Sequence, residues 1–167
     1  TRSNFLQAIK LDPRFVRPYV GLLELEREWI PATKAEGSID FTTIARRLED
    51  LGPHLAATYC AKAFLSYERL NFPEAKNWIR KAVKTDPNYE LARTSYGFML
   101  MIWGWPKEAR EQLEISQALA HSKVTITCFI GHTYREERKY DQAIECYRKV
   151  LEHLSLIHIS EPTRPRL

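Results

Sequence analysis

Long hydrophobic runs are absent from this 167-residue chain. The longest, residues 96–105, is half of the roughly 20 residues that a membrane-spanning helix needs, so we expect no membrane span. Only six glycines occur, and none lies in a glycine-rich loop that could cradle phosphate groups. The H-E-x-x-H pattern of zinc proteases and the two-residue alternation of strands are also missing.

Cysteine is scarce as well. Three cysteines, an odd number, do not make a disulfide framework. We expect Cys60 and Cys128 to lie several helix spacings apart, so they cannot pair within one chain. No secretory signal is visible, and a reducing, cytoplasmic setting is the expected location.

Charge of one sign does not gather anywhere. The 25 basic and 21 acidic residues give a net charge of +4, and pairs such as Arg46-Arg47 alternate with acids. A nucleic-acid-binding face needs a basic patch or stripe, so we expect no direct contact with nucleic acid.

A helical hairpin is the clearest feature that is present. Residues 130–151 carry two sets of apolar and small residues at helical spacing, separated by the polar turn 136–139. The first set is Ile130, Gly131 and Tyr134, and the second is Tyr140, Ala143, Tyr147 and Val150. We expect Gly131 and Ala143 to face each other, because glycine inside a helix costs roughly 0.5–1 kcal/mol unless close packing offsets it.

The hairpin recurs upstream with a period of 34 residues. Gly97 precedes Gly131 by 34, and Ala75, Ala109 and Ala143 follow the same interval. Fixed self-similarity at this period predicts a helical solenoid.

The repeats resemble tetratricopeptide (TPR) repeats. The likeness rests on G-x-x-Y … Y-x-x-A-x-x-x-Y at residues 131–147 and on A-x-x-x-I-x-x-A-x-x-x-x-P at residues 75–87. It covers most of residues 1–154 and implies an all-α, right-handed superhelix of antiparallel helix pairs, about four and a half repeats long. Glu26 and Lys62 depart from the family pattern, which favours an aromatic and a large aliphatic side chain at these places.

The pattern predicts nine helices. Their expected ranges are 2–11, 16–29, 40–51, 56–70, 72–85, 89–103, 106–120, 124–137 and 140–154. Asn71 should cap one helix, with Glu74 three residues later, and Ser38 or Asp40 should cap another. Six extra residues fall between 29 and 40; we expect a tolerated surface loop, and partner binding is the alternative.

Both ends of the chain look unlike a repeat boundary. Thr1 begins inside the second helix of a repeat, so residues 1–154 should be a repeat domain truncated at its N-terminus, from a longer protein. Residues 155–167 abandon the repeat and resemble an appended linker, so we expect a non-native or disordered tail.

Residues that could do chemistry are few. Cys128 and His132 lie four apart on one helix, but no third metal ligand is evident. Asp141 and Glu145 begin a helix, where carboxylates favour the helix dipole. We therefore expect no enzyme, no cofactor and no metal.

The resemblance implies a binding surface on the first helix of each repeat, which lines the concave face in this family. The inward positions are Cys60, Phe64, Tyr67, Thr94, Phe98, Met101, Cys128, Phe129, His132 and Arg135. The lysine and asparagine pair with which some members grip a peptide carboxylate is absent. A groove this apolar favours an aromatic or aliphatic peptide or helix; the alternative is that these side chains pack between repeats.

Two functions remain open. The chain is either a scaffold for a protein or peptide partner, or the C-terminal regulatory region of a signalling protein. Residues 12–22 are similar to repeat blocks that follow winged-helix, adenylate cyclase or Ser/Thr kinase domains in bacteria. In that second case an effector domain would lie upstream in the same polypeptide.

Overall fold

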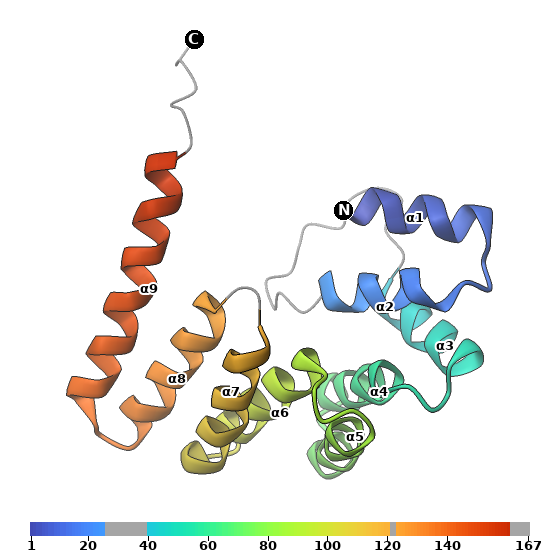
Figure 1. Cartoon of the computed structure of the whole chain (residues 1–167). Coiled ribbons are helices and arrows are strands. Elements are labelled where there is room, and N and C mark those ends of the chain that lie inside the picture. Colours follow the sequence, from blue (N-terminus) through green and yellow to red (C-terminus); the bar gives the residue numbers. More distant parts are fainter. Residues whose placement is uncertain (26–39, 121–122, 161–167) are drawn as a thin grey trace. The chain divides into compact units, whose positions relative to one another are not determined.

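The computed structural model describes residues 1–25, 40–120 and 123–160, with side chains as far as residue 154. Within these ranges every regular element is a helix and no strand occurs (Figure 1). The chain is therefore all-α, as predicted. The helices are α1 (Arg2–Leu11), α2 (Val16–Leu25), α3 (Phe41–Leu51), α4 (Ala56–Glu68), α5 (Phe72–Thr85), α6 (Glu90–Ile102), α7 (Pro106–Leu119), α8 (Val124–Glu136) and α9 (Tyr140–Ser160).

Most helix ends agree with the repeat pattern to within two residues, but the end of α9 does not. The predicted end at residue 154 is wrong, because α9 runs on to Ser160. Residues 155–160 contain no glycine or proline, and the first residue that disfavours continued helix is Pro162. The inserted segment 30–40 lies almost wholly outside the described residues, as do Glu26 and Ser38.

Both predicted caps that can be inspected are formed. The Asp40 carboxylate accepts a hydrogen bond from the Thr43 backbone N–H at 2.9 Å. Asn71 Oδ1 accepts from the Glu74 N–H, and Asn71 Nδ2 donates to the Glu74 carboxylate at 2.8 Å. These side chains satisfy backbone donors that the first turn leaves unpaired.

The chain divides into two compact units, Thr1–Ser95 and Tyr96–Leu167. In the first unit α1 packs on α2, α2 on α3, α3 on α4 and α4 on α5. Its core includes Leu22, Leu23, Ile44, Leu48 and Ile79, each almost completely buried. One face each of α2, α3 and α5 supplies these residues, as the apolar spacing predicts.

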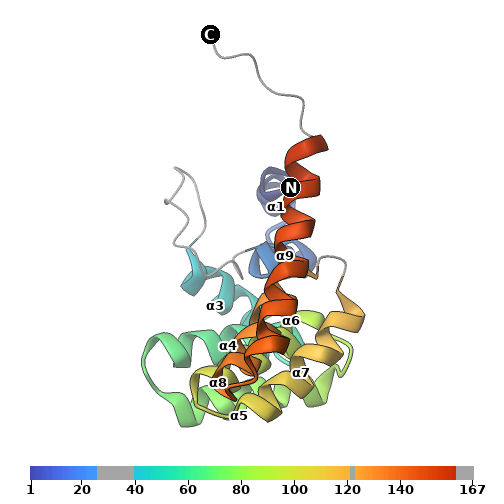
Figure 2. The same cartoon turned by 90° about the vertical axis from the view of Figure 1, so that its left-hand side faces the viewer.

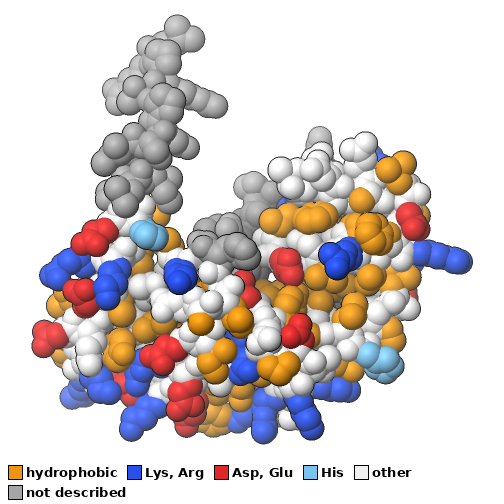
Figure 3. Space-filling view, viewed as in Figure 1, with side chains coloured by type: hydrophobic (Ala, Val, Ile, Leu, Met, Phe, Trp, Pro, Cys, Tyr) orange, Lys and Arg blue, Asp and Glu red, His pale blue; other side chains and the backbone are white. Residues whose placement is uncertain are grey.

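In the second unit α8 packs between α7 and α9, and α9 runs alongside α8 (Figure 1). In the view of Figure 2, α9 lies in front of α8. Leu113 of α7 and Ile126 and Ile130 of α8 form its core. Acidic and basic side chains interleave over α8 and α9 on the face shown in Figure 3.

Glycine permits close helix approach at Gly97 and Gly131. A Cβ at Gly97 would lie 2.6 Å from Leu113 Cγ, and one at Gly131 would lie 2.7 Å from Tyr147 Cε1. The expected close contact is thus present, although the atoms nearest to Gly131 belong to Tyr147 and Cys146 rather than to Ala143.

The turns within the hairpins repeat their hydrogen bonds at the same period. The N–H groups of Leu70, Gly104 and Arg138 donate to the carbonyl three residues earlier, and those of the next residues to the carbonyl five earlier. This is the Schellman arrangement that ends helices. All three residues have positive φ, at 59°, 81° and 60°, yet only one is glycine.

The last two hairpins are joined by an ion pair. Arg110 of α7 reaches Glu137, at the end of α8, with 2.7 Å between Nη1 and Oε2, and both side chains are largely shielded from solvent. Arg110 also lies over the Tyr134 ring. Four large hydrophobic residues of α9 are exposed: Tyr140, Ile144, Leu151 and Leu154.

Candidate functional site

The first helix of each hairpin carries the ten predicted groove residues, which divide between the two units. Phe98 of α6 and Phe129 of α8 lie together in the second unit, with ring centroids 5.2 Å apart. Both rings are half-buried, as is Met101 one turn after Phe98. Successive first helices thus bring aromatic rings into contact on a surface that solvent still reaches.

Cys128, His132 and Tyr147 form a small cluster beside Phe129. His132 Nε2 lies 3.7 Å from Cys128 Sγ, and its Nδ1 lies 3.2 Å from the Tyr147 hydroxyl. Burial lowers the pKa of His132, with the Arg135 charge adding to the effect, and burial raises the pKa of the Cys128 thiol. Both groups are therefore neutral at pH 7. A nucleophilic cysteine is instead a thiolate, commonly paired with a protonated histidine.

Arg135 is exposed at the end of α8 and pairs with its neighbour Glu136, with 3.0 Å between nitrogen and oxygen. A ligand carboxylate at Arg135 would therefore compete with Glu136. Among the described residues no group of three or more His, Cys, Asp or Glu side chains could hold a metal ion.

The four predicted residues of the first unit are less accessible. Cys60 is fully buried and Phe64 only 8% exposed, and the Phe64 ring packs against Phe41 at 5.9 Å. Tyr67 is half-buried against Phe72. Thr94 is buried and donates a hydrogen bond to Glu90.

The first unit instead has a cleft that the sequence analysis did not identify. It measures about 590 Å³ and is bounded by α1, α2, the start of α4 and the turn before α6. Arg17, Val20, Gly21 and Glu24 follow one stripe of α2 along it. The two charges are seven residues apart, or about 10 Å along the helix. Helical spacing alone could have found this stripe, because the helix that carries it was predicted over residues 16–29.

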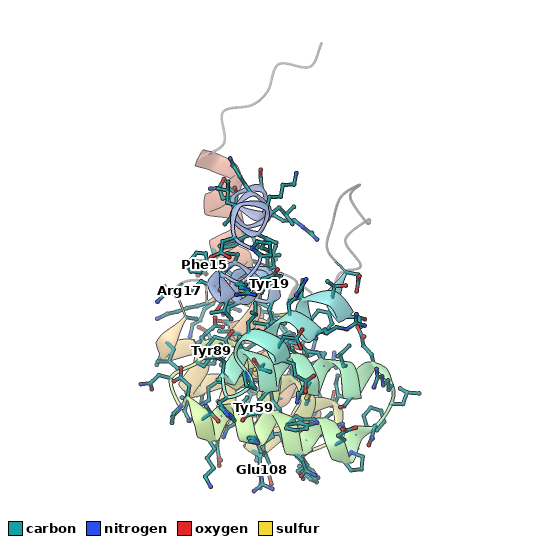
Figure 4. The ribbon with its side chains drawn as sticks, turned by 90° about the vertical axis from the view of Figure 1, so that its right-hand side faces the viewer. Phe15, Arg17, Tyr19, Tyr59, Tyr89 and Glu108 are labelled. Atoms are coloured by element: carbon teal, nitrogen blue, oxygen red, sulfur yellow. The ribbon has the colours of Figure 1, made fainter. Side chains whose placement is uncertain are left out.

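Tyr89 lies at the same cleft (Figure 4). Its hydroxyl oxygen is buried and has no hydrogen-bond partner within 3.5 Å among the described residues. Burial, followed by the nearby Cys60 and Glu24, raises the pKa of this phenol, which stays protonated. The Glu24 carboxylate is close enough to this phenol to act as its hydrogen-bond acceptor.

Comparison with known proteins agrees with the repeat geometry. A family model described as tetratricopeptide repeat matches residues 126–152, which span most of α8 and the first part of α9. The chain is 28% identical over 97 residues to the TPR repeat-containing protein MJ0940 of Methanocaldococcus jannaschii. Residues 126–152 match a tetratricopeptide repeat. The match to MJ0940 covers 58% of this chain and 30% of that relative.

Solved TPR structures share the fold. A crystal structure of MamA protein has a TM-score of 0.63 at 16% identity, covering 99% of this chain and 87% of that one. TTC0263, a thermophilic TPR protein of Thermus thermophilus, has a TM-score of 0.64 at 17% identity, covering 90% and 80%. The TPR fold is a scaffold for protein–protein interaction, so protein partners are expected of it. No helix among the described residues is long and apolar enough to cross a membrane.

Proposed function

We propose that this TPR domain binds a peptide segment of a partner protein along the first helices of its repeats. The observation that carries the proposal is the contact between Phe98 and Phe129, two half-buried rings from successive first helices. Aromatic side chains that solvent reaches are typical anchors of binding interfaces, because they bury a large area at small entropic cost.

The cleft on α2 supports the same function with a different chemistry. Its apolar floor, including Val20, separates the Arg17 and Glu24 charges. A segment with an acidic and a basic residue about 10 Å apart and an apolar residue between them would complement this stripe. Such a spacing fits residues seven apart in a helix or three apart in a strand.

A scaffold role rather than catalysis is supported by the cluster at Cys128. The neutral thiol and the neutral imidazole of His132 are suited to packing, since a cysteine nucleophile needs a thiolate. We therefore propose that Cys128 and His132 shape the binding surface beside Phe129.

A peptide-display selection against the whole chain tests the proposal. Selected peptides would then be titrated by fluorescence anisotropy against wild type, Phe98→Ala and the charge reversal Arg17→Glu, with Arg46→Ala on the exposed side of α3 as the control. Truncating an aromatic anchor costs about 2 kcal/mol or more, so Phe98→Ala should weaken binding roughly 30-fold, while Arg46→Ala should leave it unchanged.

Melting curves of each variant separate binding from folding. Selected peptides that bind Phe98→Ala and Arg17→Glu as tightly as wild type would show that the first helices are not the binding surface. A Phe98→Ala protein that loses its helical signal would show that this ring belongs to the core.

A further inference from the structure

A second groove, in the unit Tyr96–Leu167, contains none of the ten predicted residues. It measures about 770 Å³ and lies between α7, α8 and α9. Thr127 and Ile130 of α8 and Gln142, Cys146 and Lys149 of α9 are among its lining residues.

In the α4–α5 hairpin the equivalent place is filled by two stacked aromatic rings. Tyr59 (labelled in Figure 4) and Trp78 have ring centroids 5.9 Å apart and are nearly parallel. Lys81 Nζ lies 4.4 Å from the Tyr59 centroid and 5.5 Å from that of Trp78. The indole Nε1 donates to Glu74 at 3.2 Å. The stack thus combines ring contact, a cation over the rings and a hydrogen bond for the indole N–H.

Two periods later the rings are gone, and two of the polar side chains around them persist; Lys62, which also lies over the Trp78 ring, is replaced by Ile130. Thr127 stands in the place of Tyr59 and Cys146 in the place of Trp78. Gln142 stands in the place of Glu74 and Lys149 in that of Lys81. All four residues line the groove. The turns of the two hairpins are alike, because their backbone hydrogen bonds recur at equivalent residues.

The small side chain at Thr127 is fixed at the wall of the groove. Its hydroxyl donates to the Lys123 carbonyl at 2.7 Å and accepts from Gln117 Nε2 at 2.8 Å. Gln142 is exposed and offers an amide oxygen where Glu74 offers a carboxylate. Lys149 makes an exposed ion pair with Glu145 at 3.5 Å, which contributes little and can be given up.

We propose that this groove receives an aromatic side chain, with tryptophan preferred, from a partner protein. The indole would occupy the space that Tyr59 and Trp78 fill in the earlier hairpin, against Thr127 and Cys146. Its N–H would donate to the Gln142 side-chain oxygen, and the Lys149 ammonium would lie over the ring face. The inference is independent of the groove on the first helices, because the two surfaces share no residue.

The test uses the full chain with N-acetyl-tryptophanamide as the probe and N-acetyl-leucinamide as the control ligand. Methyl signals of Thr127 and Ile130 are followed by NMR during titration. We expect saturable shifts with the tryptophan probe only. Thr127→Tyr, which restores a ring found in the earlier hairpin, should abolish them, and Thr127→Ser should retain them. Should Thr127→Tyr fail to fold, Cys146→Trp fills the groove from the other helix.

The hydrogen bond is tested separately. Gln142→Ala should weaken binding of the tryptophan probe about five-fold. It should not change the affinity of the 1-methylindole analogue, which has no N–H. Three results would overturn the proposal. They are equal binding of the tryptophan and leucine amides, undiminished binding of the tryptophan amide to Thr127→Tyr or Cys146→Trp, and no saturable shift with the wild type. Self-association of the wild type that disappears in Thr127→Tyr would make a second copy the occupant, and would also overturn it.

Discussion

The Leu70→Gly variant should be more stable than the wild-type protein, although the substitution removes a large hydrophobic side chain. The φ of Leu70, 59°, lies in the left-handed region, which costs a residue with a Cβ about 1–2 kcal/mol. The side chain is 73% exposed, so its removal forfeits little burial. Glycine gains roughly 0.5–1 kcal/mol of entropy in the unfolded chain, which offsets part of the relief. The net expectation for Leu70→Gly is a gain of about 0.5–1 kcal/mol.

The assay is thermal and urea unfolding followed by circular dichroism. For a chain of this length the gain corresponds to a rise in Tm of roughly 1–4 °C. Leu70→Ala is the matched control, since it removes the same exposed side chain but keeps a Cβ in the left-handed conformation. It should not raise the Tm.

The reciprocal change is Gly104→Ala, one period later. Gly104 has φ of 81°, and no atom lies within 4 Å of where its Cβ would be. Any loss therefore comes from the backbone conformation alone, at about 1 kcal/mol or more. If Leu70→Gly lowered stability as much as Leu70→Ala, or if Gly104→Ala were neutral, the reasoning from positive φ would be refuted.

Three further changes test the packing, the ion pair and the tail. Gly131→Leu should cost about 1–3 kcal/mol or more, since even a Cβ would lie 2.7 Å from Tyr147; an unchanged melting temperature would contradict this. The hydrogen bond from Arg110 lowers the pKa of Glu137 below its ordinary value of 4.5. The stability it gives is therefore present above about pH 4.5 and is lost as pH falls through the lowered pKa. Glu137→Gln should flatten that part of a Tm–pH curve, and an unchanged acid limb would be the contrary result. Removing residues 155–167 should leave Tm almost unchanged, whereas strong amide protection at residues 156–159 would mean that they dock.

The sequence was sufficient for the helices because their determinants are local. The apolar spacing, the Asn71 cap and the 34-residue period each act within one hairpin. The end of α9 was the exception, because repeat matching stopped at residue 154 while helical hydrogen bonding continued to Ser160. Residues 155–160 no longer match the repeat pattern, but they can still form helix.

The surface was harder to predict than the helices. The Phe98 and Phe129 rings lie in contact, whereas Phe64 packs against Phe41 and is buried. Which of these positions is buried depends on the neighbouring helix that each one meets. Lys62 looked unsuitable for a packed position. In the structure it pairs with Glu49 at 2.6 Å and lies over the Trp78 ring, a tertiary arrangement that family spacing does not encode.

The exposed side of α9 also affects where local unfolding of the second unit begins. In a repeat protein, stability is approximately a sum of the stability of each hairpin and of the interfaces between neighbours. Within the described residues, the hairpin α8–α9 has its inter-hairpin interface with α7, and no helix covers Tyr140, Ile144 and Leu151. Opening that begins at α9 therefore breaks the fewest interfaces. Amide hydrogens should exchange fastest along α9, more slowly in α8 and most slowly in α7, so that local unfolding proceeds inward one helix at a time.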